Sequence, residues 1–323
     1  MLVLDGRDVT RALSMADCID AVAEGLRLHA EGRQTLFPRQ QLRADPDDAL
    51  LGLMPAAAGA PERLWGLKAV LVAPGNRAKG LDSHQGAIVL FDAETGVPRA
   101  IVDATAITAL RTAAASAVAT RALARPDARA VAILGSGTQA RSHVAAMRHI
   151  LPRARIVLWS RSPVAAAALA FELGVETAPD ARLAVEGADV VCTVTGSHVP
   201  ILERDWLAPG AHVNAVGASR PDARELGSDV VAAAEVFVDS RAQAAVECGE
   251  LLIARTEGRI GDGHIRAELG EVLAGRHPGR GSDTALTIFK SLGIAVEDLA
   301  AAARAVRRAT ESGIGRTLDW RAA

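Results

Sequence analysis

Apolar residues recur along the chain with two different spacings, and these spacings divide the sequence into regions. Between residues 10 and 32, residues such as Met15 and Ile19 recur four positions apart. That spacing predicts a helix with one apolar face, and Thr10 or Ser14 can cap its first turn. The N-terminal region is therefore expected to begin with a helix that packs against something else.

Residues 40–105 show a different pattern, in which short apolar runs alternate with turn-forming residues. Proline and glycine pairs, such as Pro74-Gly75, interrupt the runs every ten residues or so. This pattern predicts an antiparallel β-rich region. The expected strands lie at 50–54, 67–72, 87–91 and 99–102. An alanine-rich helix is expected to follow over 107–123.

From residue 129 the chain alternates short apolar strands with helical segments. Such alternation predicts a Rossmann-type, doubly wound parallel sheet, and we place the boundary of this domain near 124–127. The last segment, 286–308, is predicted to be helical with an interruption at Gly293. The expected strands are 130–134, 155–159, 190–193, 211–216 and 236–238, and the expected helices are 138–150 and 164–173.

Composition and charge narrow the class of protein. The chain has 323 residues, of which 50% are hydrophobic and 23% are charged, so it is expected to fold with a large core. Its net charge of -2 gives no basic surplus for nucleic acid or an anionic membrane. No apolar run approaches the roughly 18 residues of a spanning helix. Three scattered cysteines form no zinc motif and suit the cytoplasm.

The sequence contains no tyrosine. Reductases that use a tyrosine hydroxyl as their acid or base are therefore excluded. Any proton that the reaction needs must come from another kind of side chain or from solvent.

A glycine-rich loop follows the strand expected at 130–134. Gly135 and Gly137 begin the pattern GxGxxA, and Ala140 ends it at the start of a predicted helix. In this setting the first glycine permits a tight turn and the second lets a pyrophosphate approach the backbone. The helix N-terminus, with Thr138 and Gln139, offers N–H groups to the phosphates. The loop predicts a dinucleotide site.

The end of the next strand favours one dinucleotide over the other. An NAD site usually has an acidic residue there, but no acid occurs between residues 155 and 165. Ser160, Arg161 and Ser162 instead offer hydroxyls and a guanidinium to a 2′-phosphate. We therefore expect NADP(H) to be preferred, with NAD(H) possible. No metal site is predicted.

Two later strand ends are expected to complete the cofactor site. Thr195 follows the strand at 190–193, and Val216 and Gly217 follow the strand near 211–216. The carboxyl ends of parallel strands share one edge of a sheet, where such domains bind their cofactor.

Three basic residues of the N-terminal region stand in unusual surroundings. Lys68 lies inside an apolar strand and Arg111 lies in a nearly apolar helix, while Arg39 precedes the β-rich region. A cation in such surroundings must be paired or face a cleft. Salt-bridged structural cations would give the same pattern, so spacing alone leaves both readings open.

Several motifs together resemble the ornithine cyclodeaminase/mu-crystallin family, over residues 36 to the end. The sequences of these motifs most resemble those of mu-crystallin-like ketimine reductases. The matching stretches are Gly66–Lys68, Ser83–Gly86, Ile107–Ala114, Gly135–Ala140, Pro209–Gly217 and Phe289–Gly293.

The resemblance implies an α+β substrate-binding and dimerisation domain, built from 1–124 and 300–323, around a Rossmann domain at 125–299. It also implies a homodimer, while the cytoplasmic location is expected from the sparse cysteines. By the same resemblance, Arg39, Lys68 and Arg111 hold a substrate carboxylate, and Thr112 lies against the cofactor.

One position departs from the pattern of the cyclodeaminases. Where those enzymes carry a catalytic Asp, this chain has Ser219, and the nearby Asp222 lies beyond a proline. A hydroxyl shuttles protons poorly near neutral pH, which disfavours an ornithine cyclodeaminase and, with it, an alanine-type amino-acid dehydrogenase. A small-ligand-binding protein that requires NADPH, of mu-crystallin type, is the alternative from another class.

The sequence thus predicts hydride transfer from NAD(P)H to the C=N carbon of a small cyclic ketimine that carries a carboxylate, such as piperideine-2-carboxylate or pyrroline-2-carboxylate. Ser219 is expected to contact the substrate. Lys68 is the first candidate to protonate the imine nitrogen, and His84 is the second.

Overall fold

The computed structural model describes residues 1–43, 49–59 and 62–320. The chain divides into two compact units, of which unit 1 comprises residues 1–111 and 294–323 and unit 2 comprises residues 112–293. The first boundary falls inside helix α3 (Ala104–Leu123), whereas the sequence placed it after that helix. The second falls at 293, before the expected position at 299.

Unit 1 is built on an eight-stranded sheet whose strand order is β16-β1-β7-β6-β5-β4-β2, with β3 also paired to β4. All pairings are antiparallel except that of β1 with β7. The four expected strands are confirmed as parts of β4 to β7. The strands are β1 (Leu2–Leu4), β2 (Gln34–Leu36), β3 (Gln40–Arg43), β4 (Leu50–Ala58), β5 (Leu64–Val72), β6 (His84–Asp92), β7 (Pro98–Asp103) and β16 (Arg316–Thr317).

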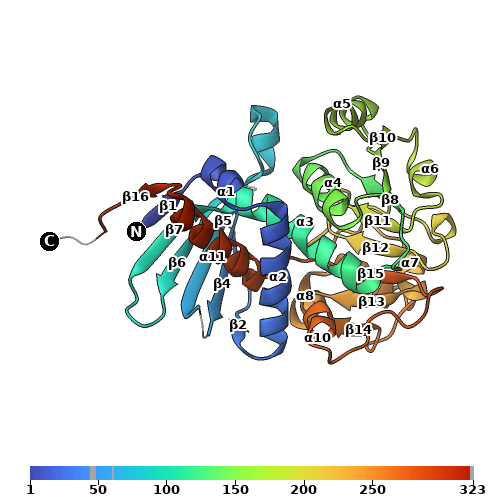
Figure 1. Ribbon diagram of the computed structural model, residues 1–323. Helices are drawn as coiled ribbons and strands as arrows, with labels where there is room; N and C mark the ends of the chain where they lie inside the picture. Colours follow the sequence, from blue (N-terminus) through green and yellow to red (C-terminus); the bar gives the residue numbers. More distant parts are fainter. Residues whose placement is uncertain (44–48, 60–61, 321–323) are drawn as a thin grey trace. The chain divides into compact units, whose positions relative to one another are not determined.

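Three helices of unit 1, α1 (Gly6–Ala12), α2 (Met15–Ala30) and α11 (Ala295–Ser312), lie on one face of this sheet (Figure 1). The predicted helix over 10–32 is confirmed over residues 15–30 as α2, with Ser14 as its cap, whereas residues 10–12 end the separate helix α1. Asp5 caps α1, and the Ser14 hydroxyl accepts the Asp17 N–H at 3.1 Å to begin α2.

The opposite face of the same sheet is apolar and partly exposed. Its side chains alternate along the strands with the buried ones that face the helices. We call this surface the open sheet face. Its residues are Leu42, Leu51, Trp65, Leu67, Leu71, Val89, Phe91 and Ile101.

Unit 2 is built on an eight-stranded, fully parallel sheet with the order β10-β9-β8-β11-β12-β15-β13-β14. The chain changes direction across the sheet at β8, with β9 on one side and β11 on the other. The Rossmann-type sheet is therefore confirmed. The strands are β8 (Ala130–Leu134), β9 (Arg155–Trp159), β10 (Glu176–Thr177), β11 (Val190–Thr193), β12 (His212–Ala215), β13 (Glu235–Val238), β14 (Ile265–Glu268) and β15 (Thr287–Lys290).

The prediction of a helical segment over 286–308 was wrong in its first part, because residues 287–290 form the buried strand β15. A turn then separates β15 from α11. Leu292 and Gly293 donate their N–H groups to the buried Asp239 carboxylate, both at 2.6 Å, and Gly293 has a φ of +74°. This turn is incompatible with one continuous helix.

The remaining helices connect the strands of unit 2, apart from one short 3₁₀-helix, η1, that belongs to unit 1. None of the described helices is long and apolar enough to cross a membrane. The helices are α4 (Thr138–Ile150), α5 (Pro163–Leu173), α6 (Ala181–Val185), α7 (Ser228–Ala233), α8 (Arg241–Glu247), α9 (Gly249–Thr256) and α10 (Leu269–Leu273), with 3₁₀-helices η1 (Pro74–Lys79) and η2 (Arg204–Trp206).

Candidate functional site

The glycine-rich loop of unit 2 leaves β8 and enters α4 with the geometry that a dinucleotide needs. Gly135 has a φ of +140°, and a Cβ there would lie 2.8 Å from the Val194 carbonyl oxygen. A Cβ at Gly137 would meet no atom within 4 Å, so the chain itself leaves this space open. Gly137 also brings no side chain to cap α4, whose first turn includes Thr138 and Gln139.

Ala140 completes the motif from inside the fold. Its side chain is fully buried, which lets α4 pack closely against the sheet. The arrangement fits a pyrophosphate held on the helix N-terminus, with the backbone as the donor.

The end of β9 carries the three residues expected at a 2′-phosphate. Ser160 shares a hydrogen bond of 2.8 Å with the hydroxyl of Ser136, and the Ser162 hydroxyl caps α5 by accepting the Ala165 N–H at 3.3 Å. Arg161 is exposed, and its guanidinium has no hydrogen bond or ion pair with the residues that the structure describes. Of the three, Arg161 is the group most available to a ligand.

Thr195 and Gly217 follow β11 and β12, which are neighbouring parallel strands. Both donate backbone N–H groups to the buried carboxylate of Glu225, each at 2.7 Å. Val216 precedes Gly217 and is half-buried. The structure thus brings Thr195, Val216 and Gly217 to one edge of the sheet, beside an acid that sequence reasoning missed.

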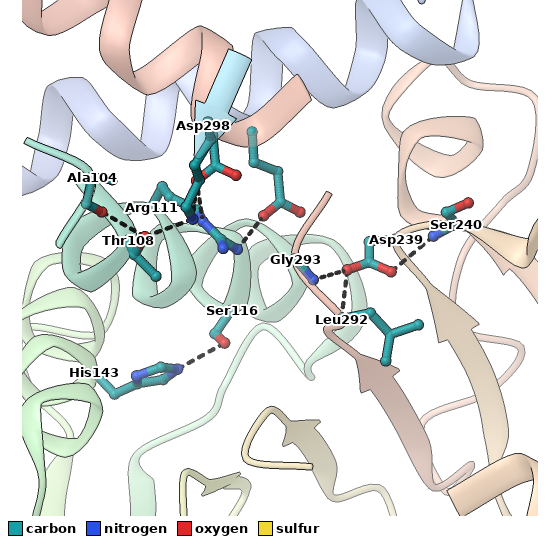
Figure 2. Close-up of polar contacts among 12 residues, drawn as sticks. Ala104, Thr108, Arg111, Ser116, His143, Asp239, Ser240, Leu292, Gly293 and Asp298 are labelled. Atoms are coloured by element: carbon teal, nitrogen blue, oxygen red, sulfur yellow. Dashed lines mark hydrogen bonds and ion pairs between the residues drawn. The ribbon is translucent and has the colours of Figure 1, made fainter. Parts of the chain in front are cut away.

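In unit 1, Lys68 and Arg111 lie together in a buried ion cluster with two acids of α11, as Figure 2 shows for Arg111 and Asp298. Asp298 Oδ1 accepts from Lys68 Nζ at 3.0 Å and from Arg111 Nε at 2.9 Å. Glu297 Oε2 accepts from Arg111 Nη1 at 2.9 Å. We call these four residues the ion cluster.

Thr108 fixes the direction of the Lys68 ammonium group. Its hydroxyl donates to the Ala104 carbonyl at 2.6 Å, and its oxygen accepts from Lys68 Nζ at 2.7 Å. Thr108 and Asp298 therefore take two of the three N–H protons of Lys68. The third has no partner among the described residues.

Burial and charge act in opposite directions on the ion cluster. Burial lowers the pKa of Lys68 to about 8, although Asp298 works against this shift. Burial also disfavours the charged form of Arg111, but Asp298 and Glu297 outweigh it and raise the pKa of Arg111. The pKa of Asp298 falls below its usual value because Arg111 and Lys68 outweigh the effect of burial.

Arg39 and His84 differ in their relation to the ion cluster, since Arg39 affects the pKa of Lys68 whereas the register of β5 and β6 places His84 away from Lys68. Arg39 is half-buried between β2 and β3, and its charge contributes to the lowered pKa of Lys68. His84 is exposed, and its ring accepts or donates a 3.0 Å hydrogen bond with Ser83. In the register of β5 and β6, Lys68 pairs with Ile88, so His84 lies about 13 Å farther along β6. The register does not bring His84 to Lys68.

Thr112 is buried on α3, directly after Arg111. Ser219 is half-buried in the segment after β12. The nearby Asp222 is exposed and pairs with Arg220 at 2.7 Å, so its carboxylate is engaged at the surface. Asp222 therefore does not replace the acid that Ser219 lacks.

Sequence reasoning missed Glu297 and Asp298, although a signal was present. The two acids stand among Ala295, Val296 and Leu299 in a helix that is apolar at this point. The argument that singled out Arg111 in an apolar helix applies equally to them. No described group of three or more His, Cys, Asp or Glu side chains could hold a metal ion.

Unit 2 thus defines a Rossmann-type dinucleotide-binding protein, and unit 1 adds a buried set of cations that suits an acidic small molecule. The chain belongs to the ornithine cyclodeaminase/mu-crystallin family, whose model matches residues 1–313.

Three relatives illustrate this membership. Mouse ketimine reductase mu-crystallin is 42% identical over 254 residues, which are 78% of each chain. The structure of Thermococcus litoralis Delta(1)-pyrroline-2-carboxylate reductase with NADH and L-proline has a TM-score of 0.94 and 34% identity, covering 98% of this chain and 100% of that one. An archaeal alanine dehydrogenase dimer with bound NAD has a TM-score of 0.92 and 33% identity, covering 99% of each.

The ion cluster predicts a large cost for removing one of its acids. Asp298→Asn leaves Lys68 and Arg111 buried with one carboxylate between them, so we expect the free energy of unfolding to fall by about 3 kcal/mol. Urea unfolding followed by circular dichroism measures the change.

Asp17→Asn is the matched control, because Asp17 pairs with Arg308 at 2.6 Å where both side chains are partly exposed. An exposed pair of this kind contributes below about 1 kcal/mol. Equal losses of unfolding free energy in the two variants would show that the buried ion cluster stabilises the fold no more than an exposed ion pair does.

Proposed function

We propose that this protein reduces small cyclic ketimines that carry a carboxylate, with NAD(P)H as the hydride donor. Pyrroline-2-carboxylate and piperideine-2-carboxylate are the expected type of substrate. The observation that carries the proposal is the Lys68 ammonium group, which is buried, held by Thr108 and Asp298, and left with one N–H to donate. The mouse and Thermococcus relatives, named as reductases of this kind, support it.

The charges around Lys68 suit one carboxylate. Lys68 and Arg111 are balanced by Glu297 and Asp298, so the ion cluster as a whole is neutral. Arg39 adds one positive charge whose effect reaches Lys68. In the proposed complex, Arg39 and Arg111 bind the substrate carboxylate through their N–H groups, with Lys68 beside them.

The reduction needs one hydride and one proton. The nicotinamide, when bound by the glycine-rich loop and the strand ends of unit 2, supplies the hydride to the imine carbon. In the proposed reaction the third N–H of Lys68 donates the proton to the imine nitrogen, and solvent returns it. A pKa of about 8 leaves Lys68 mostly protonated at neutral pH and still able to release the proton.

Ser219 argues against the cyclodeaminase activity found elsewhere in the family. Deamination of ornithine needs a carboxylate to take protons from the substrate's amino groups, and a serine hydroxyl does this poorly. Amino-acid oxidation of the alanine dehydrogenase type would run the same hydride step in reverse on an acyclic substrate. A protein that only binds ligand would bind NADPH and the imine without turnover.

We expect the purified protein to oxidise NADPH in the presence of pyrroline-2-carboxylate or piperideine-2-carboxylate. Its kcat/KM should fall as the pH rises above about 8, because Lys68 loses its proton there. Absorbance at the nicotinamide band measures the rate across the pH range.

The variant Lys68→Arg tests the proton donor. It keeps the positive charge but has a pKa too high to release the proton, so kcat should fall about a hundredfold with little change in KM. Absence of turnover with both imines would sink the proposed substrate class. Ammonia release from ornithine would favour a cyclodeaminase instead.

We further propose that the protein prefers NADP(H) to NAD(H). The support is the end of β9, which carries the exposed Arg161 and no acid from residue 155 to residue 165. The Thermococcus and archaeal structures contain NADH and NAD, so the preference proposed here rests on this chain's own β9 end.

Arg161→Ala should lower kcat/KM for NADPH about tenfold and leave kcat/KM for NADH nearly unchanged, because the guanidinium contacts only the 2′-phosphate. Arg153→Ala is the control, since Arg153 is also exposed but precedes β9 at the opposite edge of the sheet. A loss shared equally by both cofactors would refute a 2′-phosphate contact at Arg161.

We propose that two copies of the chain associate through the open sheet face. Its apolar residues lie on five neighbouring strands, β3 to β7, and they include Trp65 and Leu71, which are 47% and 44% exposed. Exposed apolar patches of this extent mark interaction surfaces. The archaeal alanine dehydrogenase, described as a dimer, supports a homodimer here.

Val89→Glu places a charge at the centre of the open sheet face and should convert the dimer into a monomer, as measured by light scattering after gel filtration. Phe171→Glu is the control, because Phe171 is 91% exposed on α5 in unit 2. Circular dichroism verifies that both variants fold. A folded Val89→Glu variant that remains dimeric would place the interface elsewhere.

A further inference from the structure

Glu225 is a fully buried acid that the proposed reaction does not use. It lies six residues after Ser219, and its carboxylate accepts four hydrogen bonds. Oε1 accepts from the backbone N–H and the hydroxyl of Thr195, both at 2.7 Å. Oε2 accepts from the Thr193 hydroxyl at 2.8 Å and the Gly217 N–H at 2.7 Å. All four acceptor positions of the ionised Glu225 carboxylate thus bind donors at the ends of β11 and β12.

These bonds join the end of β11 to the end of β12. The fit is close, because a Cβ on Gly217 would lie 2.0 Å from the Thr195 carbonyl oxygen and 2.5 Å from Glu225 Oε1. The Gly217 N–H also donates to the Thr193 carbonyl oxygen at 3.2 Å, so its bond to Glu225 is one branch of a bifurcated hydrogen bond. Together these bonds tie the Thr195 and Gly217 N–H groups to the ends of both strands. Glu225 holds them in one arrangement.

A second buried ion pair, Lys290 with Glu250, fixes Ala218, the residue after Gly217. Lys290 of β15 donates to the Ala218 carbonyl oxygen and pairs with Glu250 Oε2 at 3.1 Å. Glu250 Oε1 in turn accepts the backbone N–H of Glu225 at 3.2 Å. Residues 217–218 are therefore fixed from both sides by side chains that are almost completely buried.

We propose that Glu225 is a positioning residue for the cofactor, because it sets the relative place of the Thr195 and Gly217 backbones that line the proposed cofactor site. The inference rests on the proposed function, in which Thr195, Val216 and Gly217 contact the dinucleotide. Glu225 itself does not touch the cofactor in this proposal. It acts through the two strand ends.

A carboxylate is required at position 225 because both of its oxygens accept hydrogen bonds, and not only because of its size. Backbone N–H groups can only donate, so both oxygens must be acceptors. Burial raises the pKa of Glu225, while the bonds from Thr195 and the charge of Lys290 oppose that shift. An amide in its place would turn an NH₂ group toward the Gly217 or Thr195 N–H, and the two donors would move apart.

The test compares three variants by direct titration with NADH and NADPH, by steady-state kinetics with a cyclic imine, and by urea unfolding. Glu225→Gln should raise the Kd for both cofactors at least about tenfold, with the KM for the imine changed much less. Thr193→Val removes one of the four bonds and keeps the side-chain shape, so its Kd should rise only about threefold to fivefold.

Asp189→Asn is the matched control. Asp189 also accepts two backbone N–H groups, from Arg129 at 2.8 Å and Ala130 at 3.0 Å, but it lies before β11 at the opposite edge of the sheet. It should lower stability and leave the Kd for cofactor within twofold of the wild type, an effect on the order of 0.4 kcal/mol.

The outcomes separate this inference from the proposed function. A wild-type protein that binds neither dinucleotide contradicts the proposed function itself. A wild type that binds, together with a Glu225→Gln variant whose cofactor Kd is unchanged or rises no more than that of Asp189→Asn, overturns the positioning role. If Glu225→Gln does not fold, Thr193→Val decides, and an unchanged Kd there overturns the inference equally.

Discussion

The burial of Lys68 and Arg111 requires that other parts of the chain come to them. A buried cation is unstable unless an acid is beside it, and both acids of the ion cluster are supplied by α11, more than 180 residues away in sequence. The C-terminal helix must therefore return to unit 1, where it covers β4, β5 and β6. The same pairing keeps the two cations close together, because Asp298 Oδ1 binds both. The pairing of the two buried cations and the attachment of the last helix thus depend on one interaction.

Unit 2 uses carboxylates in a related way, to accept backbone N–H groups at strand ends and turns. Glu225 and Asp239 are buried, and Asp189 is partly exposed. Asp189 accepts the N–H groups of Arg129 and Ala130 at the beginning of β8, Glu225 accepts those of Thr195 and Gly217 after β11 and β12, and Asp239 accepts those of the turn after β15. Gly137 gives the first turn of α4 no side-chain cap, and α7 likewise begins at Gly227 without one. At the glycine-rich loop the helix N-terminus can thereby face an anion.

Much of unit 2 could be predicted from local pattern, because each strand there is a short apolar run between turn residues. Strands 130–134, 155–159 and 190–193 have the predicted bounds, and the GxGxxA loop lies where the motif requires. The pattern failed at 287–290, since a short buried strand and a buried helix segment look alike in sequence. The start of the helix expected over 10–32 was also misplaced, since α1 ends at Ala12 and Ser14 caps α2.

The same limit of local sequence pattern separates the site residues that were predicted from those that were missed. Motifs identified Arg111 and Gly137 because their surroundings in sequence are unusual. The partners Asp298 and Glu225 were missed because their importance lies in contacts that span 187 and 32 positions, which no local spacing encodes. A search for charged residues within apolar segments would have found Asp298. It would have found Glu225 less readily, since that residue follows Arg224 in a polar stretch.

The chain's supply of proton-transferring groups is what favours an imine as the substrate. There is no tyrosine, and burial lowers the pKa of His143 and His212 to about 4 and about 3, which keeps both rings neutral. Burial raises the pKa of the cysteine thiols to about 12. Lys68, with a pKa of about 8, is the buried group whose pKa lies nearest neutrality among these. One such donor is enough for a reduction in which a single proton joins the imine nitrogen. Deamination of an amine moves several protons, and the Ser219 hydroxyl does not serve as the second base that such a reaction needs.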